Sequence, residues 1–225
     1  MNLETFGIIR NISTFSVLLP LCVFFLALYK KNQPYTVKVT GVLLLVAALS
    51  DFLSAFLYAQ FKINPNPIIS IYVLLQFLTL SLIYEDSYTH RWTKWMTRIV
   101  NILFTFFAIL NFFLVQGIFG FNSYSFALSA VIFIIYAILF SCQLLVELPD
   151  KHLERTFMFW VNSAVFFYFG TNLYLFATVD QLISRQDTSQ FLLSWAMHNV
   201  SNVLKNIMFS VAMFVALLNR NQPTI

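Results

Sequence analysis

The last long apolar stretch of the chain, residues 191–218, reads FLLSWAMHNVSNVLKNIMFSVAMFVALL. As an α-helix this stretch extends about 42 Å, which exceeds the roughly 30 Å hydrocarbon core of a bilayer. Lys205 lies near its centre and is the only Lys, Arg, Asp or Glu residue in it. A cation at that depth costs about 2.5–3.5 kcal/mol on insertion scales unless a partner or water stabilises it. A span that keeps such a residue therefore indicates a function or a specific internal pairing.

Working outward from this stretch, we find six others of similar length and character, at residues 12–29, 37–59, 67–84, 95–116, 123–146 and 156–178. Of the 225 residues, 60% are hydrophobic and only 10% are charged, whereas soluble domains have about 25% charged residues. No stretch has the short alternating pattern of a membrane barrel, and helices are the other backbone solution in lipid. The sequence predicts an all-α membrane protein of one domain, with seven transmembrane helices in a bundle.

Lys and Arg residues are shared unevenly between the two sides of this predicted bundle. One side has nine of them: Lys30, Lys31, Lys38, Arg91, Lys94, Arg98, Lys151, Arg155 and Arg220. The other side has three: Arg10, Lys62 and Arg185. Because the connections are short, the positive-inside rule predicts an outside N-terminus and a cytoplasmic C-terminus. The net charge of +4 belongs to these membrane-flanking loops, so it does not predict a nucleic-acid partner.

Three residues predict local features of the helices. Pro20 lies inside the first span and predicts a kink. Gly170 lies inside the sixth span and predicts the close approach of a neighbouring helix. Pro149 follows the fifth span, and its ring predicts the end of that helix.

Polar side chains in the last span recur at helical spacing. Residues three and four apart share a helix face, and this spacing connects Ser194, His198, Ser201, Asn202 and Lys205. A second line, about 120° further round the helix, contains Asn199, Asn206 and Ser210. Because lipid cannot satisfy the charged row, we expect it to face the interior of the bundle.

Asp51 in the second span is the predicted partner of Lys205. Each residue lies about fourteen positions from one end of its span, so both are expected near the middle of the membrane. The second and seventh helices are commonly neighbours in a ring of seven, which predicts an ion pair between the two side chains. Removing either partner is then expected to leave a buried charge uncompensated.

Smaller polar groups in other spans complete a predicted ligand-binding set. The third span has Tyr72 and Gln76, and the sixth has Asn172. The full set is Asp51, Tyr72, Gln76, Asn172, His198, Asn202 and Lys205. An equally simple alternative is structural, because Asn, Gln and Ser in spans frequently join helices and the Asp51–Lys205 pair can be purely stabilising.

We predict no metal ligand, no catalytic residue and no cofactor. The chain has neither clustered His, Cys and acidic residues at metal spacing nor a recognisable catalytic motif. A lysine in the seventh span invites comparison with retinal proteins. However, the third span, residues 69–85, has no mid-span acid as counter-ion, and the sixth lacks a Trp-x-x-Tyr-Pro pattern.

Three segments give the chain a family resemblance: residues 66–72 (NPIISIY), Phe159-Trp160 with Tyr168-Phe169-Gly170, and Trp195, His198-Asn199, Asn202 and Lys205-Asn206-Ile207. With these segments the chain resembles a family of small bacterial membrane proteins with seven helices, similar to the membrane sensor regions of signalling proteins. The resemblance implies a multi-pass protein of the bacterial inner membrane. Residues 31–36 also share a Lys…Pro-Tyr-Thr pattern with lysoplasmalogenase-like membrane hydrolases.

The predicted function is that of a membrane sensor or small-ligand-binding protein. Connections of about ten residues are too short for a separate catalytic or output domain, so a signal has to pass to a cytoplasmic or membrane partner. One alternative is a transporter that moves a small solute or protons along the polar face of the last span. Another is a lipid head-group hydrolase with Asp51 and His198 as acid and base. An enzyme is the less favoured class, and the ligand stays open.

Overall fold

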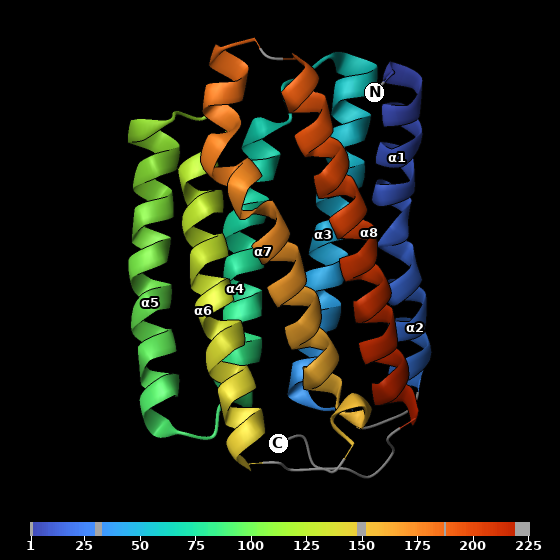
Figure 1. Cartoon of the computed structure of the whole chain (residues 1–225), viewed down its shortest axis with the longest axis vertical. Coiled ribbons are helices and arrows are strands. Elements are labelled where there is room, and N and C mark those ends of the chain that lie inside the picture. The colour runs from blue at the N-terminus through green and yellow to red at the C-terminus, as the bar shows by residue number, and fades with distance from the viewer. Residues whose placement is uncertain (1, 30–32, 148–151, 187, 219–225) are drawn as a thin grey trace.

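The computed structural model describes residues 2–29, 33–147, 152–186 and 188–218. Throughout these ranges the chain forms helices joined by short turns and contains no strand. Figure 1 shows the helices as upright rods whose direction alternates along the chain. Helix α1 begins at one end of this bundle and α8 ends at the other. The predicted all-α helical bundle is confirmed.

The helices are α1 (Leu3–Ser16), α2 (Leu18–Tyr29), α3 (Tyr35–Phe61), α4 (Asn66–Ser87), α5 (Arg91–Leu110), α6 (Ser123–Glu147), α7 (Phe157–Ser184) and α8 (Thr188–Leu218). A π-helical turn, η1 (Asn111–Val115), continues α5, and a 3-10 turn, η2 (Leu153–Arg155), precedes α7. The predicted spans match these helices to within four residues at all but two ends. Helix α7 continues to Ser184 rather than ending at Thr178. The first helical rod begins at Leu3 rather than at Ile12.

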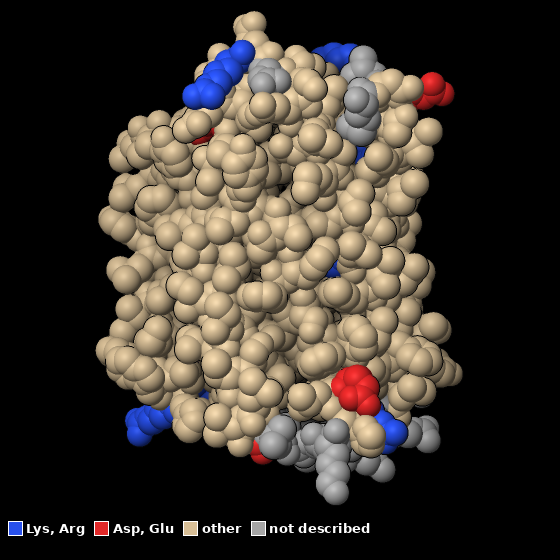
Figure 2. Space-filling model, viewed as in Figure 1, with Lys and Arg blue, Asp and Glu red and all other residues tan. Residues whose placement is uncertain are grey.

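Within the described ranges, six helical segments are long and apolar enough to cross a membrane, and α7 is not among them. Helix α7 has 28 residues, but Asn162 and Asn172 interrupt its apolar sequence. Both side chains are buried, at 5% and 2% exposed, so neighbouring helices surround its polar side. Figure 2 shows the charged residues on one face gathered mainly near the two ends, with a largely uncharged belt between them. The helices are therefore those of a multi-pass membrane protein, while a seventh span stays a prediction.

Some predictions fall on residues outside the described ranges. They concern Pro149 and four of the basic residues that were counted for orientation: Lys30, Lys31, Lys151 and Arg220. Among the described Lys and Arg residues outside the centre, the end where α1 begins has Arg10, Lys62 and Arg185. The opposite end has Lys38, Arg91, Lys94, Arg98 and Arg155.

The helices enclose a centre formed by α3, α4, α7 and α8. Helix α8 packs against α7 on one side and against α1 and α2 on the other. Helix α3 packs against α4 and α2, while α6 packs against α7. Helix α5 lies at one edge, where it packs mainly against α4. The sequence predicts that the second and seventh spans, α3 and α8, are neighbours. They do not pack closely and instead face each other across the centre.

Near Pro20 the rod is interrupted at Val17, between the end of α1 and the start of α2, while a bend at this point stays a prediction. Proline has no backbone N–H to donate to the carbonyl four residues earlier, and its ring clashes with that carbonyl. The carbonyl in question is that of Ser16, the last residue of α1. The next hydrogen bond, from Leu21 N to Val17 O, is long at 3.4 Å.

Helices α2 and α3 meet at Gly41, not at the glycine that the sequence singled out. A Cβ atom added at Gly41 would lie 1.9 Å from Cζ of Phe24, whose ring is buried on α2. A Cβ atom at Gly170 would meet nothing within 4 Å. The predicted close approach at Gly170 is therefore wrong, because this residue lies on the exposed side of α7.

These two glycines make a matched pair of substitutions. We expect Gly41→Ala to lower the free energy of unfolding by about 1–3 kcal/mol, because the Phe24 ring has to leave its packed position. Gly170→Ala is expected to be neutral or slightly stabilising, since alanine favours the helix and meets open space. Thermal unfolding of the purified proteins in one detergent measures both. Equal melting temperatures for the two variants would contradict this account of the α2–α3 contact.

Candidate functional site

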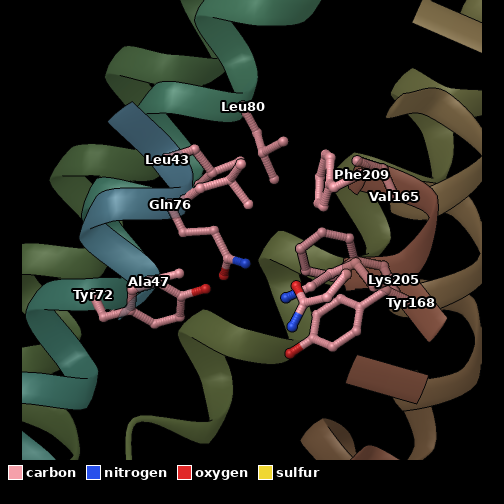
Figure 3. Close-up of a pocket in the computed structure, with 12 residues that line it drawn as sticks. Leu43, Ala47, Tyr72, Gln76, Leu80, Val165, Tyr168, Lys205 and Phe209 are labelled. Carbon is pink, nitrogen blue, oxygen red and sulfur yellow. The ribbon is translucent and has the colours of Figure 1, made fainter. Parts of the chain in front are cut away.

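A small cavity lies at the centre of the bundle among α3, α4, α7 and α8. Its polar lining is Tyr72, Gln76, Tyr168, Lys205 and Asn206, and its apolar lining includes Leu43, Leu80 and Phe209. The space open to the centres of water molecules is about 10 Å³, which is close to what one water molecule requires. Figure 3 shows Tyr72 and Gln76 of α4 on one side of the cavity, facing Lys205 and Tyr168 on the other.

Lys205 is buried in this site, with 8% of its surface exposed. Its Nζ atom lies 4.4 Å from the centroid of the Tyr168 ring, a geometry in which the negative face of the ring attracts the cation. Among the described residues, the ammonium group forms no hydrogen bond, and no carboxylate lies within 4.0 Å of it. A ring face compensates a buried charge only in part, so the donor capacity of Lys205 is largely unused.

Asp51 lies close to the cavity without forming the predicted ion pair with Lys205. Its carboxylate is within electrostatic range of Lys205 and of the hydroxyls of Tyr72 and Tyr168. In the described part of the chain, however, the ion pairs within 4.0 Å are Arg98–Glu85 at 2.6 Å and His152–Glu154 at 3.1 Å. The prediction of direct contact fails because α3 and α8 face each other across the centre. The two charges attract one another across this gap.

A double-mutant cycle tests whether the two charges depend on each other. We expect Lys205→Met and Asp51→Asn each to destabilise the protein, because each leaves the opposite charge in a low-dielectric interior. The double variant is expected to lose less than the sum of the single losses, with a coupling free energy of about 1 kcal/mol or more. Thermal and denaturant unfolding in detergent measure all four proteins. Strictly additive losses would show that the charges are energetically independent.

Asn172 and His198 form a second polar group, which lies nearer the end where α8 begins. The Asn172 Nδ2 atom donates to the Tyr168 carbonyl at 2.7 Å and to Ser201 Oγ at 2.7 Å. A carbonyl only accepts, so the amide oxygen of Asn172 is the atom that faces His198 Nδ1 at 2.9 Å. Nδ1 must therefore carry a hydrogen, which leaves Nε2 of the neutral ring as an acceptor.

Aromatic rings surround His198. The centroids of Trp195, Tyr168 and Phe176 lie 5.1, 5.8 and 6.0 Å from the imidazole centroid. His198 is not part of the cavity lining, although it is within electrostatic range of Lys205. The arrangement fixes the position of the ring, which is what a helix–helix packing role requires.

The two asparagines that follow on α8 contact α1. Asn202 Nδ2 donates to Ser13 Oγ at 2.9 Å, and Asn206 Nδ2 donates to Ser16 Oγ at 2.7 Å. Asn202 therefore faces away from the predicted ligand site. Such bonds between membrane helices contribute about 0.6–1.7 kcal/mol each. The Oδ1 atom of Asn206 is buried and has no hydrogen-bond partner among the described residues.

Of the seven predicted site residues, the cavity thus brings together Tyr72, Gln76 and Lys205, while Asp51 does not line it but is within electrostatic range of Lys205. Asn172 and His198 form the adjacent group, and Asn202 binds α1. The predicted set omitted Tyr168 and Asn206. Asn206 comes directly after Lys205 in the sequence and belongs to the second polar line of the span, which was a usable signal. Tyr168 belongs to one of the segments that give the family resemblance, but nothing in its spacing predicted that its ring lies beneath Lys205.

A separate polar cluster joins η1, α6 and α7 at the end where α1 begins. The carboxylate of Asp180 accepts hydrogen bonds from Gln116 Nε2, at 2.7 Å, and from Ser123 Oγ. The Asn111 amide donates to Gln116 Oε1 at 2.8 Å and also contacts Asn122. Sequence reasoning did not identify Asp180. The cluster fixes the end of α7 that lies near the start of α1, and its members do not line the central cavity.

In the described ranges, no three His, Cys, Asp or Glu side chains converge as a metal site would require. Comparison of the chain with known protein families, with curated proteins and with solved structures gave no match. The resemblance to bacterial sensor proteins therefore stays a prediction, as does the weaker pattern shared with membrane hydrolases.

Proposed function

We propose that this protein crosses the bacterial inner membrane seven times, with its N-terminus outside, and acts as a sensor. A small ligand binds at the central Lys205 site, and the protein passes the signal to a cytoplasmic or membrane partner. Six apolar helices support the membrane placement, and α7 runs alongside them as a seventh rod. The described basic residues, five at one end and three at the other, support the orientation.

Cysteine labelling tests this orientation. Gln60 and His90 are exposed at opposite ends of the bundle, and both native cysteines, Cys22 and Cys142, are first replaced by alanine. In intact cells, a membrane-impermeant maleimide is expected to label Gln60→Cys and to spare His90→Cys until the membrane is opened. Labelling with the reverse preference would invert the topology, and equal labelling of both sites in sealed cells would contradict the span count.

The observation that carries the sensor proposal is the state of Lys205. Its ammonium group is buried beside a cavity, forms no hydrogen bond with the described residues, and faces the amide of Gln76 across the space. Ionisable residues inside membrane spans generally mark functional sites because their burial is costly. A ligand that accepts hydrogen bonds from Lys205 recovers part of that cost.

The size of the cavity determines how the ligand acts. With room for about one water molecule, a larger ligand binds only when α3 and α4 separate from α7 and α8. Binding then favours a wider arrangement of the helices over the compact one, and this shift of population is the signal. Helices α3 and α8 do not pack closely against each other, so their separation breaks few contacts.

The transporter alternative has less support from the cavity. Leu43, Leu80 and Phe209 lie on its side towards the predicted cytoplasmic end, at 3%, 2% and 3% exposed. These side chains offer no hydrogen bonds to a solute or proton that leaves Lys205 in that direction. The hydrolase alternative requires Asp51 and His198 to act on the same substrate. His198 is instead held by Asn172 and by aromatic rings.

Small solutes of different charge test the sensor proposal. Acetate, glycine, methylamine and urea are added separately to the purified protein in nanodiscs, and thermal unfolding is followed. At about 100 times its dissociation constant, a bound solute stabilises the protein by about 2.7 kcal/mol. We expect at least one solute to raise the melting temperature of the natural protein and to leave that of Lys205→Met unchanged.

Liposome assays with the same solutes separate the three functions. The sensor proposal predicts binding without flux and without release of phospholipid head groups. Solute uptake that Lys205→Met abolishes would establish transport instead. Head-group release that depends on Asp51 would establish the hydrolase.

A further inference from the structure

Helices α1 and α2 form one broken rod, yet they are held to the bundle in different ways. Helix α2 is held by apolar packing, with Leu21 at 5%, Phe24 at 4% and Ala27 at 0% exposed. On α1, the one side chain buried among those described is that of Ser13. Helix α2 thus buries several apolar side chains against the bundle, whereas α1 buries a single polar one among those described.

Helix α1 packs against α8, and two side-chain hydrogen bonds join the two helices. These are the bonds from Asn202 to Ser13 and from Asn206 to Ser16, at 2.9 and 2.7 Å. One aromatic contact to α3 adds to them, with the ring centroids of Phe15 and Phe52 5.7 Å apart. Polar contacts of this kind are formed and released with little repacking of the apolar core.

The break at Val17 provides a pivot between the two halves. Pro20 cannot donate to the Ser16 carbonyl, and the Leu21–Val17 bond is 3.4 Å long, near the limit for a hydrogen bond. Ser16, at the end of α1, is also the residue that Asn206 holds. The pivot and one of the two attachments are thus adjacent.

Asn206 connects this attachment to the central cavity. Its side chain lines the cavity, its Nδ2 binds Ser16, and its Oδ1 is buried without a partner in the described structure. Lys205, the next residue towards the N-terminus, lines the same space. A change inside the cavity therefore acts on the Asn206 side chain, which binds Ser16 of α1.

We propose that α1 is an arm that pivots at Val17, and that Asn206 couples its position to the occupancy of the cavity. The inference rests on the proposed sensor function and adds the chemistry of the ligand. The ligand accepts a hydrogen bond from Lys205 and donates one to Asn206 Oδ1. To meet the ligand, the Asn206 amide turns and weakens its bond to Ser16, which releases the arm.

Distances between spin labels test the arm without any ligand. In a background without Cys22 and Cys142, one pair of labels is placed at Ile8 and Leu193 and reports on the arm. A second pair at Phe25 and Phe214 reports on α2. All four side chains are at least half exposed. Because Ile8 lies nine residues, or about 13.5 Å, from Val17, a pivot of about 10° moves it by about 2 Å.

Four variants are compared in nanodiscs: Asn206→Leu and Ser16→Ala remove the attachment, and Lys205→Met changes the cavity. Ser210→Ala is the control on α8, because its hydroxyl donates within its own helix to the Asn206 carbonyl at 2.7 Å. We expect the first three to shift or broaden the Ile8–Leu193 distances and to leave the Phe25–Phe214 distances unchanged. Ser210→Ala is expected to change neither pair.

Other outcomes would overturn the proposal. Unchanged Ile8–Leu193 distances in both Asn206→Leu and Ser16→Ala would exclude the arm, and equal shifts in the two label pairs would exclude the pivot. A shift in Asn206→Leu without one in Lys205→Met would exclude the coupling to the cavity. Failure to bind any solute would count against the sensor function alone, since these distances are measured without ligand.

Discussion

Hydrocarbon offers no hydrogen bonds, so every polar group within the membrane has to find its partner inside the protein. This constraint accounts for the inward orientation of the polar side of α8. It also accounts for the reciprocal pairs that connect the helices. Asn172 satisfies His198 and Ser201 together, and Tyr84 donates to Asn162, which in turn donates to Ser141. In such pairs the cost of burying one polar residue is offset by its neighbour.

Lys205 departs from this pattern, as does the Oδ1 atom of Asn206, and both residues line the central cavity. The ammonium group has the face of the Tyr168 ring and the distant charge of Asp51, but neither compensates it as a hydrogen-bonded carboxylate would. A protein selected for stability alone gains from an apolar side chain at this position. Polar side chains face each other across the cavity (Figure 3). Leu43, Leu80 and Phe209 close it towards one end of the bundle.

Helical periodicity predicted most of the fold, because the length of an apolar segment and the positions of its charges can be read locally from the sequence. The inward face of α8 and the break at Pro20 followed from the same local rules. The partners of each polar residue did not, since they depend on which helices are neighbours. Asp51 and Lys205 were placed at similar depth, but depth does not specify lateral distance. Asn202 lies on the predicted polar face of α8 but contacts α1. The face is wide enough that one part of it lines the cavity and another part packs against α1.

The glycines also show that a local pattern does not specify which helices are neighbours. Gly41 and Gly170 both interrupt apolar helices, and only the tertiary packing distinguishes the one beneath the Phe24 ring from the one on an open surface. Tyr168 illustrates it for aromatic residues, which fill the core and the lipid-facing surface alike. One tyrosine beneath a cation cannot be recognised among them without the neighbouring helix.

The π-helical turn at the end of α5 restricts how this region can vary. Its wider ring, closed by the bond from Gln116 N to Asn111 O at 3.0 Å, contains one residue more than an α-helical turn. Deleting a single residue from the turn would restore regular geometry while rotating Gln116 by about 100° away from Asp180. The length of this turn and the identity of residue 180 are therefore linked. Homologous chains with a shorter α5 are expected to have replaced the aspartate as well.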